Sequence, residues 1–326
     1  MKKLKVFLGV AISALFIYIL MRNIDYAEIR AALRGINYYV ILPAVILQLA
    51  SYWVRSARWR YILSGIKEIK TKDLLPIISI SYMANNLLPL RMGEIVRAYM
   101  VGKKSNISSA AAFSTIILER IYDGITLLLF LGITALVFPF PDWVKQIGIL
   151  TSLLFFGALI FLIGLVSFKQ KSLLFLNRCL KVFPKGIAQK VKDISDKFIE
   201  GFEVVRNKKV LIPIGIYSII IWTMEASLFY AIAQAFEFHS AIYLSFFVLV
   251  IVNLGIMVPS SPGYIGTFEF FVTRSLNVFG IAKEIALGYA LILRVFQYIP
   301  ITIVGMIFML IEGLTFSKIT KLYRKQ

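Results

Sequence analysis

Residues 253–269 read NLGIMVPSSPGYIGTFE and interrupt an apolar stretch with a cluster of prolines and glycines. Proline removes a backbone donor and glycine relaxes the backbone, so the segment does not continue as a regular helix. Residues 85–94, NNLLPLRMGE, interrupt a second apolar stretch in the same way. The residues that we assign to these two helix breaks are Asn86, Pro89 and Gly93 in the first, and Pro259, Pro262, Gly263 and Gly266 in the second.

The chain around these breaks has the composition of a membrane protein. Of its 326 residues, 59% are hydrophobic and 16% are charged, against about 45–50% and about 25% in soluble domains. We expect one polytopic membrane domain over residues 1–326, without a large soluble catalytic domain. One cysteine and one histidine argue against a disulfide framework and a metal centre, and we expect no cofactor. The net charge is +19, but the basic residues flank apolar runs, so we expect no nucleic-acid partner.

Apolar runs are candidates for membrane segments, because about 20 apolar residues cross the hydrocarbon core. The runs cover residues 6–21, 38–54, 74–90, 107–138, 146–168, 210–236, 240–268 and 285–311. The first run follows three lysines and has no small-residue cleavage site after it. We interpret it as an uncleaved signal anchor with a cytoplasmic N-terminus.

The distribution of Lys and Arg predicts the topology, because these residues accumulate on the cytoplasmic side. Of the 36 Lys and Arg residues, 26 lie in the tails and in residues 55–72, 103–104 and 169–209. All of these stretches lie on the cytoplasmic side only if two segments enter the membrane and return to the side from which they came. We predict an all-α integral membrane fold of about six transmembrane helices and two re-entrant broken hairpins. The hairpins cover about residues 73–102, from the cytoplasm, and about 240–279, from outside. Both termini are then cytoplasmic in a multi-pass protein of the cell membrane.

The two breaks belong to an internal repeat. Glu94 precedes Arg120 by 26 residues, and Glu269 precedes Arg294 by 25. We assign repeat 1 to residues 38–138 and repeat 2 to residues 210–315. Because their hairpins open from opposite sides, the repeats have the inverted topology of many secondary transporters. Residues 169–209, which link them, carry apolar side chains at helical spacing among lysines, and we predict a cytoplasmic amphipathic helix there.

Ionisable side chains at membrane depth cost about 2.5–3.5 kcal/mol each on insertion scales, so each is a candidate for function. We expect the helices that start after Pro89 and Pro262 to present free N–H groups to an anion at the membrane centre. Arg120 and Arg294, one from each repeat, would add donors suited to a phosphate. The candidate substrate-binding residues are Arg91, Glu94, Arg120, Asp123, Ser260, Ser261, Glu269 and Arg294. Secondary candidates are Arg97, Glu119, Glu225 and Gln297.

A structural alternative accounts for the same charges. Glu119 with Arg120, and Glu269 with Arg274, would then form ion pairs that hold the broken helices, with no ligand involved. Glu94 and Glu269 would be carboxylates that cap helix starts.

Three motifs resemble the flippase-like membrane family typified by the transmembrane region of lysylphosphatidylglycerol synthase. They are NLLPLRMGE at residues 86–94, ERIYD at 119–123 and PSSPGYIGTFE at 259–269. The resemblance covers nearly the whole chain and implies a lipid translocator, with Arg91, Glu94, Arg120, Asp123, Glu269 and Arg294 as the positions to carry over. No soluble transferase domain follows Gln326, so we do not expect lysyl transfer.

The function that we predict is a lipid flippase or scramblase, not an enzyme. An anionic or aminoacylated phospholipid headgroup would cross through a central polar cavity while the acyl chains stay in the bilayer. No Walker-type phosphate loop is present, so any coupling would use proton or ion gradients. The alternatives are a translocator of polyprenyl phosphates or glycolipids, a membrane-embedded lipid-phosphate enzyme with Glu119 or Asp123 as base, and a small-solute transporter. The expected partners are membrane lipids and a second copy in a homodimer.

Overall fold

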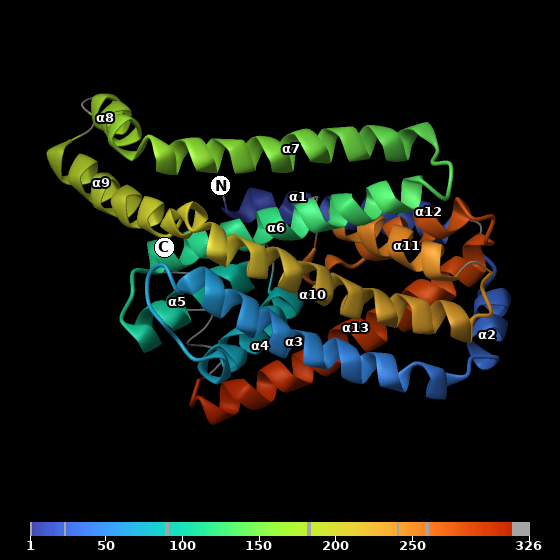
Figure 1. Ribbon diagram of the computed structural model, residues 1–326. Helices are drawn as coiled ribbons and strands as arrows, with labels where there is room; N and C mark the ends of the chain where they lie inside the picture. Colours follow the sequence, from blue (N-terminus) through green and yellow to red (C-terminus); the bar gives the residue numbers. More distant parts are fainter. Residues whose placement is uncertain are drawn as a thin grey trace.

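The computed structural model describes residues 2–22, 24–88, 91–180, 184–239, 241–257 and 261–314. Every regular element in these ranges is a helix, as the sequence predicts (Figure 1). The elements are α1 (Lys2–Met21), α2 (Tyr26–Arg34), η1 (Tyr38–Val40), α3 (Leu42–Leu63), α4 (Thr71–Leu87), α5 (Met92–Ser105), α6 (Ser109–Ala135), α7 (Asp142–Ser167), α8 (Lys169–Leu180), α9 (Lys185–Glu200), η2 (Glu203–Arg206), α10 (Lys208–Ala235), α11 (Ala241–Gly255), η3 (Pro262–Tyr264), α12 (Thr267–Asn277) and α13 (Lys283–Ile311).

Four helical segments in the described ranges are long and apolar enough to cross a membrane. They are Tyr38–Leu63, Asp142–Ser167, Lys209–Ala235 and Lys283–Ile311. Helix α6 has 27 residues, which is about 40 Å at 1.5 Å per residue, but it contains Glu119, Arg120 and Asp123. The part of the chain that the structure describes is therefore all-helical, with several apolar helices of membrane-spanning length.

Each predicted break separates two short helices, α4 from α5 and α11 from α12, but the boundaries of the breaks differ from our prediction. Asn86 lies in the last turn of α4, and Gly93 lies in the first turn of α5, so both residues are helical. The helix persists to Leu87 because a proline disfavours the helical backbone at the residue before it, and Leu88, which precedes Pro89 in the sequence, has an extended backbone. In the second break, Gly263 and Gly266 have φ values of 66° and 84°, which glycine adopts without a Cβ penalty. Pro89, Pro259 and Ser260 lie outside the described residues.

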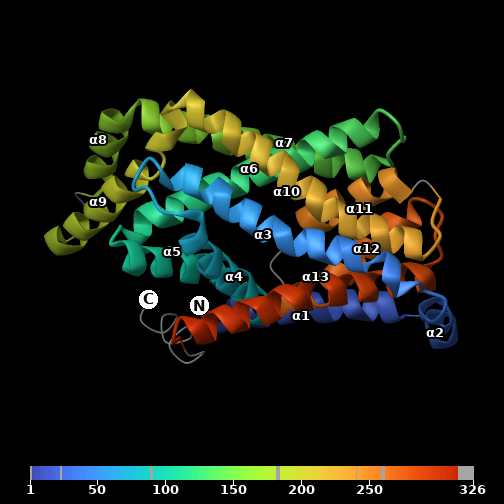
Figure 2. The ribbon, with the colours of Figure 1, turned by 60° about the horizontal axis from the view of Figure 1, so that its bottom comes forward.

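The two pairs of short helices lie at opposite ends of the molecule. Helices α4 and α5 lie in the half that also holds α8 and α9, whereas α11 and α12 lie in the half that holds α2 (Figures 1 and 2). We call these halves the α8–α9 end and the α2 end. Each half has its own apolar core, one including Trp59, Leu74 and Phe202 and the other including Phe140, Ile232 and Leu244.

Helix α9 confirms the predicted helix within residues 169–209. Its last turn and the residues after it pack inward, because Ile199 and Phe202 are buried and α9 contacts α6. Ile187 and Ile194, nearer its start, are 53% and 48% exposed. Ile187 and Ile194 are thus about half exposed, whereas the C-terminal end of α9 is covered by the protein.

Gly93 allows α5 to approach α4 closely. The Gly93 amide donates to Asn85 Oδ1 at 2.8 Å, and its carbonyl accepts from Ser81 Oγ at 2.8 Å. A Cβ on Gly93 would lie 1.9 Å from the Ser81 carbonyl oxygen. The α4–α5 pair therefore depends on the absence of a side chain at this position.

We expect Gly93→Ala to force α4 and α5 apart and to lower the free energy of unfolding by about 1–3 kcal/mol. Thermal unfolding in detergent measures the change. Gly132→Ala on α6 is the matched control, because nothing lies within 4 Å of its added Cβ; there we expect no loss and a gain of up to about 1 kcal/mol. Equal unfolding midpoints for the two variants would contradict the close approach.

Candidate functional site

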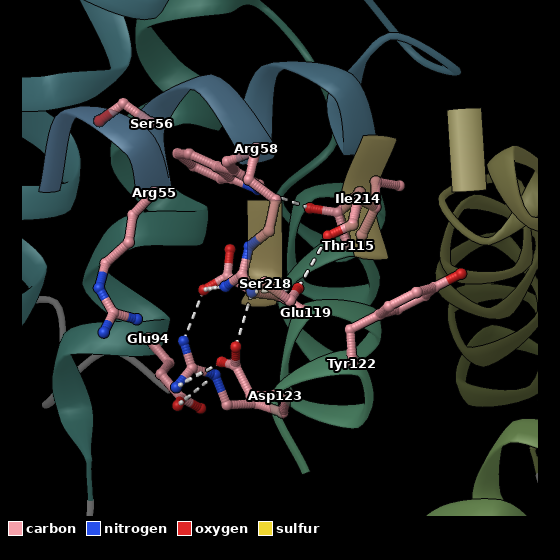
Figure 3. A network of polar contacts seen from close by, with 12 residues as sticks. Arg55, Ser56, Arg58, Glu94, Thr115, Glu119, Tyr122, Asp123, Ile214 and Ser218 are labelled. Carbon is pink, nitrogen blue, oxygen red and sulfur yellow. Dashed lines mark hydrogen bonds and ion pairs between the residues drawn. The ribbon is translucent and has the colours of Figure 1, made fainter. Parts of the chain in front are cut away.

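Glu119 on α6 is the centre of a buried ionic cluster, which Figure 3 shows from close by. Arg97 on α5 donates two hydrogen bonds to its carboxylate, at 2.9 and 2.8 Å. Arg120 donates at 2.5 Å, and Arg58 Nη2 on α3 lies 3.3 Å away. Glu119, Arg58 and Arg97 are each at most 1% exposed. One carboxylate therefore ties three helices together in the interior.

Asp123, one turn further along α6, extends the cluster. Arg58 donates to Asp123 Oδ1 at 2.6 Å, and the indole of Trp222 on α10 donates to the same oxygen at 3.0 Å. Arg120 Nη1 lies 3.4 Å from Asp123 Oδ2. Arg58 also donates to Ser218 Oγ at 2.7 Å. Since a carboxylate buried without partners is costly, these donors explain how Asp123 remains inside the protein.

Glu225 on α10 has a separate arginine partner. Arg55 on α3 donates to Glu225 Oε2 at 2.5 Å, and Gln297 on α13 donates to Oε1 at 3.1 Å. The Arg55 guanidinium also donates to the Tyr82 hydroxyl at 2.9 Å. Three aromatic rings lie within 6 Å of its central carbon, those of Tyr52, Tyr82 and Trp222. Arg55 is thus held by both a carboxylate and aromatic faces.

The second break is held by Arg294 on α13. Its guanidinium forms an ion pair with Glu269 and donates to the carbonyls of Gly263, at 2.7 Å, and Tyr264, at 3.3 Å. Glu269 Oε2 in turn accepts from the Gly266 amide at 2.7 Å. The N-terminus of α12 is therefore capped by its own glutamate, as one alternative from the sequence proposed.

An equivalent ion pair occurs next to each break. Arg120 Nε lies 3.6 Å from Glu94 Oε1, and Arg294 pairs with Glu269. The ion pair between Glu119 and Arg120 that the structural alternative predicts is present, whereas Glu269 pairs with Arg294 and not with Arg274 among the described ion pairs. Arg274 lies instead over the Trp143 ring, 5.8 Å from its centroid.

The two breaks meet in the interior. Arg91, with φ 51°, donates to the Ile256 carbonyl at 3.1 Å, and its guanidinium lies 5.6 Å from the centroid of the Tyr264 ring. A Cβ on Gly263 would lie 3.1 Å from the Asn86 carbonyl oxygen. Side chains and backbone from both halves of the chain therefore share one region.

A cavity of about 230 Å³ lies where these groups converge. Its lining includes three arginines and three carboxylates, Arg55, Arg91, Arg120, Glu94, Asp123 and Glu225. Leu127, from the core of the α2 end, and Ile301, from the core of the α8–α9 end, also line it, so the cavity lies at their boundary. The formal charges of these six lining residues cancel.

The structure brings some of the predicted site residues to this cavity and leaves others away from it. The predicted residues in the lining are Asn86, Arg91, Glu94, Arg120, Asp123, Glu225 and Gln297. Arg97 and Glu119 do not line the cavity and belong to the ionic cluster. Ser261, Glu269 and Arg294 do not line it either and belong to the second break. The Ser261 amide donates to Ser13 Oγ on α1 at 2.9 Å. Ser260 lies outside the described residues.

The sequence analysis missed Arg55 and Arg58. We assigned residues 55–72 to a cytoplasmic loop, but α3 continues to Leu63 and both arginines are buried in it. A signal for them was present, because Gln48, Ser51, Arg55 and Arg58 recur at intervals of three and four residues. That spacing places them on one helix face, and a polar face on a membrane helix points inward.

An all-helical chain with apolar helices of spanning length and a charged internal cavity is a multi-pass membrane protein. The lysylphosphatidylglycerol synthase TM region family matches residues 6–305, and the chain belongs to this family. The resemblance that the three motifs predicted is therefore confirmed.

The curated relatives include membrane proteins of similar length. A UPF0104 membrane protein of Methanocaldococcus jannaschii is 26% identical over 320 residues, which cover 92% of this chain and 93% of the relative. Another, of Methanothermobacter thermautotrophicus, is 24% identical over 295 residues, 85% of this chain and 87% of the relative. The glycosyltransferase AglD of Haloferax volcanii is 22% identical over 303 residues, which cover 83% of this chain but 48% of AglD.

Proposed function

We propose that the protein moves a lipid headgroup across the bilayer through the central cavity, as a flippase or scramblase. The observation that carries this proposal is the cavity itself, which three arginines and three carboxylates line at the junction of two broken helix pairs. Such charges are costly inside a membrane and mark pathways for polar substrates. The acyl chains would remain in the lipid.

The proposed topology has six crossings, α1, α3, α6, α7, α10 and α13, and two re-entrant pairs, α4–α5 and α11–α12. Helices α11 and α12 have 15 and 11 residues, or about 22 and 16 Å, too short for a hydrocarbon core of about 30 Å. The location of the two pairs at opposite ends (Figure 1) supports inverted repeats at residues 38–138 and 210–315. Rocking of one repeat against the other would provide alternating access.

The lining favours a headgroup with a phosphate and a cationic group. Arg91 and Arg120 would bind the phosphate oxygens by charge-assisted hydrogen bonds, while Glu94 and Glu225 would face the ammonium. A zwitterionic or aminoacylated phospholipid fits this pattern. The termini and the basic α8–α9 end would lie on the cytoplasmic side of the cell membrane.

The similarity to AglD supports a second candidate. That relative is named a glycosyltransferase, and a polyprenyl phosphate or a glycolipid would present the same phosphate chemistry to Arg91 and Arg120. A membrane-embedded enzyme acting on a lipid phosphate is the remaining alternative.

Reconstitution into liposomes tests the proposal. We expect fluorescent phospholipids in the inner leaflet to become accessible to an impermeant quencher faster than in empty liposomes, and the lipid to stay chemically intact by mass spectrometry. Polyprenyl phosphate forms the second substrate arm. Exchange at the rate of empty liposomes in both arms would refute translocation, and a changed lipid mass would favour the enzyme.

A further inference from the structure

Helix α3 carries its polar side chains on the face that the protein buries. Gln48, Ser51, Arg55 and Arg58 are each at most 3% exposed, whereas Ile46, on another face, is 70% exposed. Tyr52 and Ser56 continue the same buried face. This face packs mainly against α10 and also contacts α4 and α13. A polar stripe therefore runs inside the bundle along α3.

The stripe extends beyond the cavity toward the α2 end. On α3 the cavity is lined by Tyr52 and Arg55. Gln48 precedes Arg55 by seven residues, which is about 10 Å along the helix axis. From Gln48 to Arg58 the stripe covers about 15 Å, half of a hydrocarbon core of about 30 Å. The cavity accounts for only part of this length.

Gln48 and Ser51 have no structural partner that explains their burial. Neither amide atom of Gln48 nor Ser51 Oγ forms a hydrogen bond within the part of the chain that the structure describes. By contrast, Ser56 on the same helix donates to the Tyr52 carbonyl at 2.7 Å. Buried polar groups are normally hydrogen-bonded, so each exception calls for an explanation. An apolar side chain of similar size would stabilise this position better.

We propose that Gln48 and Ser51 form a second, uncharged station for the lipid headgroup, on the α2 side of the cavity. This inference rests on the proposed function. The amide and the hydroxyl offer donors to phosphate oxygens and acceptors to an ammonium or hydroxyl group. Because they are uncharged, they bind more weakly than the arginines, and transport needs sites that also release the substrate. The headgroup reaches this station when α3 and α10 separate.

Gln48→Leu tests the inference, because a purely structural Gln48 and a headgroup-binding Gln48 predict different rates of leaflet exchange. We expect the variant to unfold at a higher temperature than the wild type, since a buried unpaired amide is removed. We also expect leaflet exchange to slow about tenfold, a change of about 1.4 kcal/mol in the barrier. Gln234→Leu is the matched control: Gln234 is exposed on α10, and we expect neither quantity to change.

Ser51→Ala provides an independent variant that adds no volume and should slow exchange in the same direction. If both variants exchange phospholipid at the wild-type rate, the station is refuted, whatever their unfolding temperatures. If exchange is unchanged but a pH-sensitive dye inside the liposomes shows slower proton entry, the stripe carries water or protons and the headgroup station is again refuted. A wild-type protein without leaflet exchange would instead refute the proposed function.

Discussion

Glu119→Gln is expected to destabilise the protein by about 3–5 kcal/mol, the cost of breaking a buried ion pair from one side. The carboxylate of Glu119 contacts Arg58, Arg97 and Arg120, and it is 1% exposed. The substituted amide keeps the shape but removes the charge, so Arg97 loses its only carboxylate partner among the described ion pairs. Thermal unfolding in detergent, with expression level as a second readout, measures the loss.

The control for this prediction is an ion pair of similar length on the surface. Lys169 and Glu203 lie 2.6 Å apart, with side chains 35% and 40% exposed. We expect Glu203→Gln to change stability by less than about 1 kcal/mol, because exposed pairs are screened by solvent. Equally small effects for both variants would show that the Glu119 cluster contributes little to the fold.

Arg120→Ala is expected to slow leaflet exchange about 10- to 100-fold while the protein still folds. Arg120 lines the cavity and its side chain is 31% exposed, unlike the fully buried Arg58. Charge-assisted hydrogen bonds contribute about 1.5–3 kcal/mol, and each 1.4 kcal/mol corresponds to about tenfold. Glu119 keeps Arg58 and Arg97 as partners, so the cluster survives the loss. The proteoliposome assay and the unfolding midpoint are measured on the same sample.

Arg60→Ala is the matched control, since Arg60 lies on α3 but is exposed, and we expect wild-type exchange. Arg294→Ala should also reduce exchange, because Arg294 holds the carbonyls of the second break. Wild-type exchange in both Arg120→Ala and Arg294→Ala would mean that these arginines only hold carboxylates and backbone carbonyls in place, and the substrate role would fail.

The helix breaks were predictable because their causes are local. A proline lacks its backbone donor and a glycine lacks its Cβ wherever the rest of the chain lies. Residues 261–266 accordingly form only a short 3₁₀ turn, with glycines at positive φ. The boundaries of the breaks were predicted less accurately. We placed Asn86 in the first break, but α4 continues through Asn86 and ends at Leu87.

The assignment of Arg55 and Arg58 failed because their environment is created by distant residues. Counting arginines along the chain treats each of them as a charge in a loop. Whether an arginine can be buried depends on a carboxylate with which it pairs. Arg58 pairs with Asp123, 65 residues away, and Arg55 with Glu225, 170 residues away. No local pattern identifies those partners, although the three- and four-residue spacing on α3 identifies the face.

From the amino acids in order, one can conclude that this is a helical membrane protein of a particular family, interrupted at two points, with costly charges in its apolar segments. These conclusions need only composition, local backbone chemistry and recurring motifs. Which arginine pairs with which acid, that the two breaks touch, and that a cavity of balanced charge lies between them depend on the packing of helices far apart in the chain. Pairing energies act through space, and the positions of the partners exist only once the helices have packed.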